Sequence, residues 1–158
     1  GDEVLVPGLR SDPVQLVDVR DLTDFLFRLV ETGTGGTYNV VGPTSPMTME
    51  EFVHGVRACT GAPVSWVWAD DHAWLEANGL TGFVPWVLPV GDELAHMRVD
   101  GSRAIAAGLT HRPLARTVPD VIDWWHSEAV PAEVREGVRF PLAPEREREL
   151  IAAWRARG

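Results

Sequence analysis

The chain has 158 residues, of which 45 % are hydrophobic, as is usual for a single globular domain. Its formal net charge of −9 argues against a nucleic-acid partner, and no apolar run approaches the roughly 20 residues of a membrane helix, so we expect no membrane partner. Cys59 is the only cysteine, which excludes an internal disulfide and a cysteine zinc cage and favours a cytoplasmic location.

The first part of the chain alternates short apolar runs with amphipathic segments. Strands are predicted at 3–6, 13–17, 37–42 and 64–69, and helices at 19–32 and 48–60. The run 37–42 is nearly continuous in β-prone residues, as expected for a strand covered on both faces. Thr48 and Glu51 form a capping box before the second helix. Because helices separate the strands, the predicted fold class is α/β, a partial Rossmann-type parallel sheet with crossover helices.

The second part of the chain predicts a small, mostly helical lobe. Asp70 is expected to cap a short helix, and residues 80–99 to form an irregular segment. Further helices are predicted at 101–109, at 117–127 with Pro119 in the first turn, and at 144–157. We expect one domain or fragment, 1–158, in which 1–69 end the Rossmann-type sheet and 70–158 form a mostly helical lobe and the C-terminal helix.

Three aspartates at regular spacing, Asp18, Asp21 and Asp24, admit more than one interpretation. Asp18 follows a predicted strand at the N-cap position, and Asp21 lies in the first turn, where the helix dipole favours negative charge. A metal site or a place at the rim of a cleft are the alternatives, but the sequence supplies no second ligand group. The run 70–74, "DDHAW", is likewise expected to cap a helix, so we predict no metal.

Aromatic and glycine-rich segments give further candidates. Trp86, flanked by Pro85 and Pro89, is the best candidate among seven tryptophans for lining a pocket. Residues 33–36, "GTGG", follow a predicted helix and enter a predicted strand. Phosphate-binding loops run in the opposite direction, from strand to helix, so this run predicts a turn.

Four segments in order, "VQLVDVRDLTDFLFRLVE", "GTYNVVGP", "PMTMEEFV" and "VDGSRAIAAGLTHRPLARTVPDVIDWW", resemble the second half of an extended short-chain dehydrogenase/reductase of the NAD-dependent epimerase/dehydratase family. The resemblance implies that "YNVVG" is the last strand of the nucleotide-binding sheet and that 100–114 close the substrate lobe. The family usually has lysine where Arg103 stands and histidine where Asp18 stands. Its glycine loop and Tyr-x-x-x-Lys pair have no counterpart, because Tyr38 is the only tyrosine and all basic residues are arginine.

The resemblance implies the substrate-binding portion of an NAD(P)-dependent oxidoreductase or epimerase that acts on a small polar, sugar-like substrate. Trp86, Met97 and Arg98 are the expected substrate contacts, with Arg98 either pairing an anionic group or serving as a surface charge. NAD or NADP would be bound mainly by an N-terminal dinucleotide-binding half, which is the expected partner together with a possible second copy. The chain opens with "GDEVLVPG", which reads as internal sequence, and alone it is expected to be inactive. The alternative is a non-catalytic protein of the same fold that senses a dinucleotide.

Overall fold

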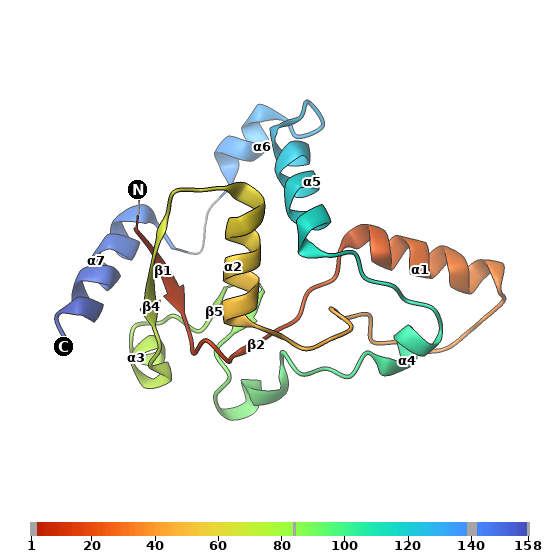
Figure 1. Ribbon diagram of the computed structural model, residues 1–158, viewed down its shortest axis with the longest axis horizontal. Helices are drawn as coiled ribbons and strands as arrows, with labels where there is room; N and C mark the ends of the chain where they lie inside the picture. Colours follow the sequence, from red (N-terminus) through yellow and green to blue (C-terminus); the bar gives the residue numbers. More distant parts are fainter. Residues whose placement is uncertain (1–2, 84, 139–141, 158) are drawn as a thin grey trace.

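The computed structural model describes residues 3–83, 85–138 and 142–157, which form a mixed α/β structure (Figure 1). Within these residues the strands pair two by two: β1 (Glu3–Pro7) with β4 (Ser65–Ala69), β2 (Pro13–Val14) with β3 (Met47–Thr48), and β5 (Gly82–Phe83) with β6 (Trp86–Val87). The helices are α1 (Val19–Glu31), α2 (Met49–Thr60), α3 (His72–Ala77), the 3₁₀ helix η1 (Gly91–Ala95), α4 (Ser102–Ala106), α5 (Leu114–His126), α6 (Ala132–Gly137) and α7 (Pro144–Arg155). None of the helices described has the length and hydrophobicity needed to cross a membrane.

Strand pairing confirms the α/β class and part of the expected topology. β1 and β4 are parallel, with Leu5 opposite Val67, and the connection between them carries α1 and α2. Parallel strands need such a long crossover, because a tight turn reverses the direction of the chain and would make the two strands antiparallel. β2 and β3 pair antiparallel, as do β5 and β6. Within the described residues the parallel sheet is therefore one pair of strands.

The prediction of a paired strand at 37–42 is wrong for this structure. Among the described residues the segment pairs with no strand, and within it only Gly42 makes a backbone–backbone hydrogen bond to another described residue, through its carbonyl to the N–H of Leu16 at 2.9 Å. Its β-prone residues suit extended backbone, but the described part of the chain places no strand beside it. β propensity expresses a fit to neighbouring strands, so it cannot create a ladder where a neighbour is lacking.

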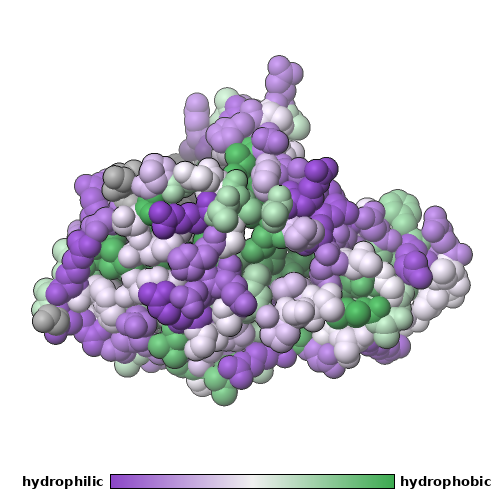
Figure 2. Space-filling model, viewed as in Figure 1, coloured by the Kyte–Doolittle hydropathy of each residue, from purple (hydrophilic) through white to green (hydrophobic). Residues whose placement is uncertain are grey.

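Buried side chains gather in two clusters. The larger has thirteen buried residues, which come from β1, β2, β4, α2, α3, α7 and the segment around β6. α7 lies along β1 (Figure 1), where Glu147 accepts a hydrogen bond from the Leu5 N–H at 2.9 Å and Arg155 pairs with Glu3. The smaller cluster consists of Phe25, Ala104 and Leu109, between α1 and α4. Figure 2 shows apolar side chains reaching the surface around α1 and α4.

Helix ends follow the expected chemistry in the first half of the chain. Asp18 caps α1 by accepting from the Arg20 N–H at 2.9 Å. Thr48 and Glu51 form the predicted capping box on α2, and the Thr48 N–H lowers the pKa of the Glu51 carboxyl. Gly61 ends α2 at φ +62°, a left-handed conformation that glycine adopts without strain.

Two predictions in the second half need correction. Asp71, not Asp70, caps α3, by accepting from the Trp74 N–H at 3.0 Å. α5 begins at Leu114 rather than at residue 117, so Pro119 lies inside the helix. The Thr117 hydroxyl, within the first turn of α5, donates to Asp18 at 2.7 Å. α6 was not predicted, while α7 confirms the charged C-terminal helix with ion pairs along its exposed face.

Candidate ligand-binding site

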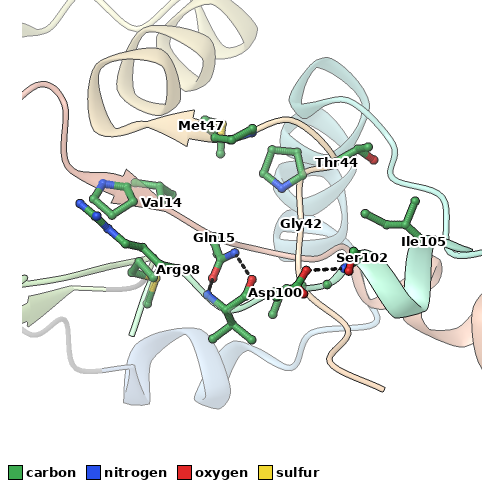
Figure 3. Close-up of a pocket in the computed structure, with 16 residues that line it drawn as sticks. Val14, Gln15, Gly42, Thr44, Met47, Arg98, Asp100, Ser102 and Ile105 are labelled. Atoms are coloured by element: carbon green, nitrogen blue, oxygen red, sulfur yellow. Dashed lines mark hydrogen bonds between the residues drawn. The ribbon is translucent and has the colours of Figure 1, made fainter. Parts of the chain in front are cut away.

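A cavity of about 490 Å³ lies where β2 and β3 meet the segments before α4 (Figure 3). That volume suits a small metabolite. Three stretches of chain supply its walls. The lining residues are Pro13, Val14, Gln15, Val41, Gly42, Pro43, Thr44, Pro46, Met47, Met97, Arg98, Val99, Asp100, Gly101, Ser102 and Ile105.

The Gln15 side chain fastens two of these walls together. Its amide Nε2 donates to the Val99 carbonyl at 2.8 Å, and its Oε1 accepts from the Val99 N–H at 2.9 Å (Figure 3). The amide thus mimics a neighbouring strand for one residue. Asn39 Nδ2 donates to the Asp100 carbonyl at 3.1 Å, so the third wall is fastened to the same segment.

The close approach of Gly101 to Val41 explains a glycine in the cavity wall. A Cβ at Gly101 would lie 3.0 Å from Cγ2 of Val41 and 3.2 Å from its carbonyl oxygen. A larger residue would push the two walls apart, since interiors have little slack for one added methyl group.

Two charged groups stand on otherwise mainly apolar walls. Asp100 accepts from the Ser102 N–H at 2.9 Å through Oδ1, and this hydrogen bond lowers the pKa of its carboxyl. The guanidinium of Arg98 has no hydrogen bond, ion pair or ring contact with any described residue, whereas the other described arginines have at least one. Arg98 can therefore pair with an anion without breaking an existing contact.

The expected substrate contacts are divided by the structure. Met97 and Arg98 line the cavity together. Trp86 does not line it; its side chain is completely buried in the larger cluster, and its indole Nε1 donates to Asp12 Oδ2 at 2.9 Å. The irregular composition around Trp86 indicated a place in a lobe, but burial of so large a ring gives more stability than exposure at a rim.

A buried polar cluster closes the carboxyl end of the parallel strands. Asp12 accepts from the Leu9 N–H at 3.0 Å and from Trp86, and its Oδ2 lies 2.8 Å from His72 Nε2. A Cβ at Gly8, directly after β1, would lie 2.5 Å from that same oxygen. Sequence analysis did not find this cluster, because Asp12 belongs to no recognisable motif.

This arrangement does not fit a dinucleotide. In parallel α/β sheets the pyrophosphate lies at the carboxyl ends of strands, against a helix N-terminus. Here that edge is filled by the Asp12 cluster, and the helix that follows β4 is preceded by Asp70 and its N-cap Asp71, whose carboxylates would repel phosphate. Residues 33–36 follow α1, as predicted, but within the described residues they lead into the unpaired segment 37–42 rather than into a strand.

The three aspartates of α1 bind arginines. Asp18 forms the cap, and the Arg20 side chain donates to both of its carboxylate oxygens, which holds the pKa of Asp18 far below its usual range. Arg112 pairs with Asp21 at 2.7 Å and with Asp24 at 2.8 Å. The capping role is confirmed for Asp18, and the partners from the loop before α5 could not be read from spacing along one helix. No group of three metal-binding side chains occurs in the described part of the chain.

No family model, no curated protein and no solved structure matches the chain. The geometry of the cavity and the motif resemblance are therefore the grounds for a function. Chemically, the cavity can hold a small molecule by apolar contact and can orient it through one free cation and one carboxylate.

Proposed function

We propose that the chain is the substrate-binding portion of an NAD(P)-dependent oxidoreductase or epimerase, and that the cavity beside Gln15 and Arg98 holds a small polar substrate. The dinucleotide belongs, in this proposal, to a separate dinucleotide-binding half. The residues described here do not fit it, so this chain contributes binding and orientation of the reactant rather than a chemical step.

One observation carries the proposal: each of the four segments that resemble the reductase family contributes to the same cavity. Gln15 comes from the first segment and Val41 to Pro43 from the second. Met47 comes from the third, and Asp100 to Ser102 from the fourth. Segments that serve packing alone need not line the same cavity, whereas residues that recognise one ligand must do so.

The charges support a substrate with an anionic group and a hydroxyl or amine. Arg98 offers a fork of N–H donors that matches a carboxylate or phosphate. Asp100 has one carboxylate oxygen engaged by the Ser102 N–H, which leaves acceptor capacity for a substrate donor. Between them the walls are apolar, from Val14, Met47 and Ile105.

A panel of sugar phosphates, nucleotide sugars and small carboxylic acids tests the proposal by ligand-observed NMR and calorimetry. We expect at least one anionic class to bind, and Arg98→Ala to weaken it about tenfold, the value of roughly one charged hydrogen bond. The melting temperature should not change, because Arg98 is exposed and its guanidinium makes no hydrogen bond, ion pair or ring contact with a described residue.

Arg146→Ala is the matched control, since Arg146 is half exposed on α7 and pairs only with Glu149 among the described residues. It should bind the same compounds as the wild type. The proposal is overturned if no compound of the panel binds, or if the compounds that bind are indifferent to Arg98→Ala.

A further inference from the structure

The polar side chains in the wall of the candidate cavity are mostly bound to other parts of the wall. The Gln15 amide is engaged at both its oxygen and its nitrogen by the Val99 peptide groups (Figure 3). Asp100 accepts hydrogen bonds from the N–H and from the hydroxyl of Ser102. Most of the hydrogen-bonding capacity of these side chains is therefore used within the protein.

The Thr44 hydroxyl is held in the same way by His111. His111 Nε2 lies 3.0 Å from the Val41 carbonyl oxygen, which can only accept, so this ring nitrogen carries a proton. In the neutral ring Nδ1 is then an acceptor, and the Thr44 hydroxyl, 2.9 Å away, donates to it. The single hydroxyl hydrogen of Thr44 is thus committed to the wall.

Backbone groups of the wall are engaged as well. The Gly42 carbonyl accepts from the Leu16 N–H at 2.9 Å, and the Asp100 carbonyl accepts from Asn39 Nδ2 at 3.1 Å. Three lining residues have no N–H to offer, because they are prolines: Pro13, Pro43 and Pro46. A ligand with several hydroxyl groups would give up hydrogen bonds to water here and find few partners in exchange.

The surface that remains for a ligand is mainly hydrocarbon. Six aliphatic or thioether side chains line the cavity: Val14, Val41, Met47, Met97, Val99 and Ile105. The described lining residues include no aromatic ring, so none offers a face on which a nucleotide base could stack. Among the polar side chains of the lining, the guanidinium of Arg98 is the one without a contact to a described residue.

We infer that the substrate of this cavity is an aliphatic acid or phosphate ester, with one anionic head bound by Arg98 and a hydrocarbon body. The inference rests on the proposed function and narrows it, because it confines the polarity of the substrate to the head and one hydroxyl, for which Asp100 retains acceptor capacity. A hydrocarbon body between Val14 and Ile105 removes apolar area from water and leaves no polar group unpaired. A sugar ring of the same size would leave hydroxyls unpaired, so the sugar-like substrate that the family resemblance implies is the weaker candidate.

Cyclohexyl phosphate and glucose 1-phosphate are the probes, because they carry the same anionic group on rings of equal size without and with hydroxyl groups. Cyclohexanecarboxylate and quinate repeat the comparison with a carboxylate head. In calorimetry at several temperatures, cyclohexyl phosphate should bind about tenfold more tightly than glucose 1-phosphate, with a negative heat-capacity change from apolar burial. The carboxylate pair should follow the same order, and the tighter of the two hydroxyl-free compounds identifies the head group.

Ile105→Asn tests whether the hydrocarbon body lies in the cavity. Ile105 lines the cavity from α4 and belongs to neither buried cluster, so the substitution places an amide in the apolar wall and spares the core. It should weaken cyclohexyl phosphate about fivefold and leave glucose 1-phosphate no weaker. Ile122→Asn is the matched control, because Ile122 is a 38 % exposed isoleucine on α5 that does not line the cavity, and it should bind both compounds as the wild type does.

The outcomes separate this inference from the proposed function. If no compound of either pair binds the wild type, both fail. If glucose 1-phosphate or quinate binds as tightly as its hydroxyl-free counterpart, the inference alone fails and the cavity remains a substrate site. The inference is also overturned if Ile105→Asn, folded by circular dichroism, keeps the preference of the wild type.

Discussion

Two regions of this molecule differ in how much of their apolar surface they bury. The β1–β4 region, which comprises β1, β2, β3, α2, β4, α3, β6 and α7, buries thirteen hydrophobic residues in one cluster. The α1 region, which comprises α1, residues 33–42 and α4, lies around a cluster of three. In the first region, even the buried carboxylate of Asp12 has three hydrogen-bonding neighbours. In the second, Val19, Leu26 and Val30 of α1 are 69 %, 52 % and 78 % exposed.

The difference indicates that the two regions contribute differently to stability and to ligand binding. Folding free energy comes mostly from apolar area removed from water, so the β1–β4 region supplies most of it. The candidate cavity lies between the regions, with Val14 and Met47 from one side and Val41 and Ile105 from the other. A ligand in this cavity would therefore contact both regions.

The largest expected effect tests the contrast in core size. Trp86→Ala should cost about 4 kcal/mol of unfolding free energy, because it empties a large buried site and leaves Asp12 without one donor. Phe25→Ala should cost about 2 kcal/mol, since its small cluster can relax around the loss. Urea unfolding measures both, with the exposed Trp124→Ala as a control within about 0.5 kcal/mol. Equal costs at Trp86 and Phe25 would contradict the contrast.

Sequence reasoning succeeded where a pattern is local. The strands at β1 and β4, the 3.6-residue period of α1 and the capping box of Thr48 and Glu51 all depend on residues within a few positions of one another. The segment 37–42 was mispredicted as a paired strand because pairing depends on a distant neighbour. The early start of α5 has the same origin, since the Thr117 hydroxyl is taken by Asp18, ninety-nine residues away.

The middle-sized effect concerns the joint between the regions. Asp18 is 8 % exposed and binds Arg20 and Thr117, so it connects α1 to α5. Asp18→Asn should cost about 2 kcal/mol at pH 7. Because Arg20 lowers the pKa of Asp18 in the folded chain, the unfolded chain binds the additional proton, and this stability is complete above about pH 4 and is lost as the pH falls further.

Urea unfolding of the wild type and Asp18→Asn at pH 7 and pH 3 measures this effect. The difference between them should narrow at pH 3. Asp24→Asn is the control, because the Asp24 side chain is 69 % exposed and its pair with Arg112 is worth little at the surface. A difference of equal size at both pH values would show that the charge of Asp18 does not stabilise the joint.

The cavity was predicted only in part, and for a similar reason. Met97 and Arg98 were identified from a stretch expected to face a substrate, and both line the cavity. Gln15 was not selected, because its role is to bind the Val99 backbone eighty-four residues away. Trp86 was selected for its proline-flanked setting, yet the Asp12 carboxylate that receives its N–H belongs to a turn with no chemical signature.

The smallest effect sharpens the boundary between the regions. Thr48→Ala removes the cap of α2, because the Thr48 hydroxyl accepts from the Glu51 N–H at 3.2 Å. The substitution should lower the free energy of unfolding by about 1 kcal/mol. Because α2 belongs to the β1–β4 region, hydrogen exchange should accelerate in the first turn of α2 and not in α1. Thr60→Ala, at the exposed far end of the helix, should change neither. If the amides of α1 accelerate with those of α2, the two regions open as one unit, and the α1 region draws its stability from the larger core.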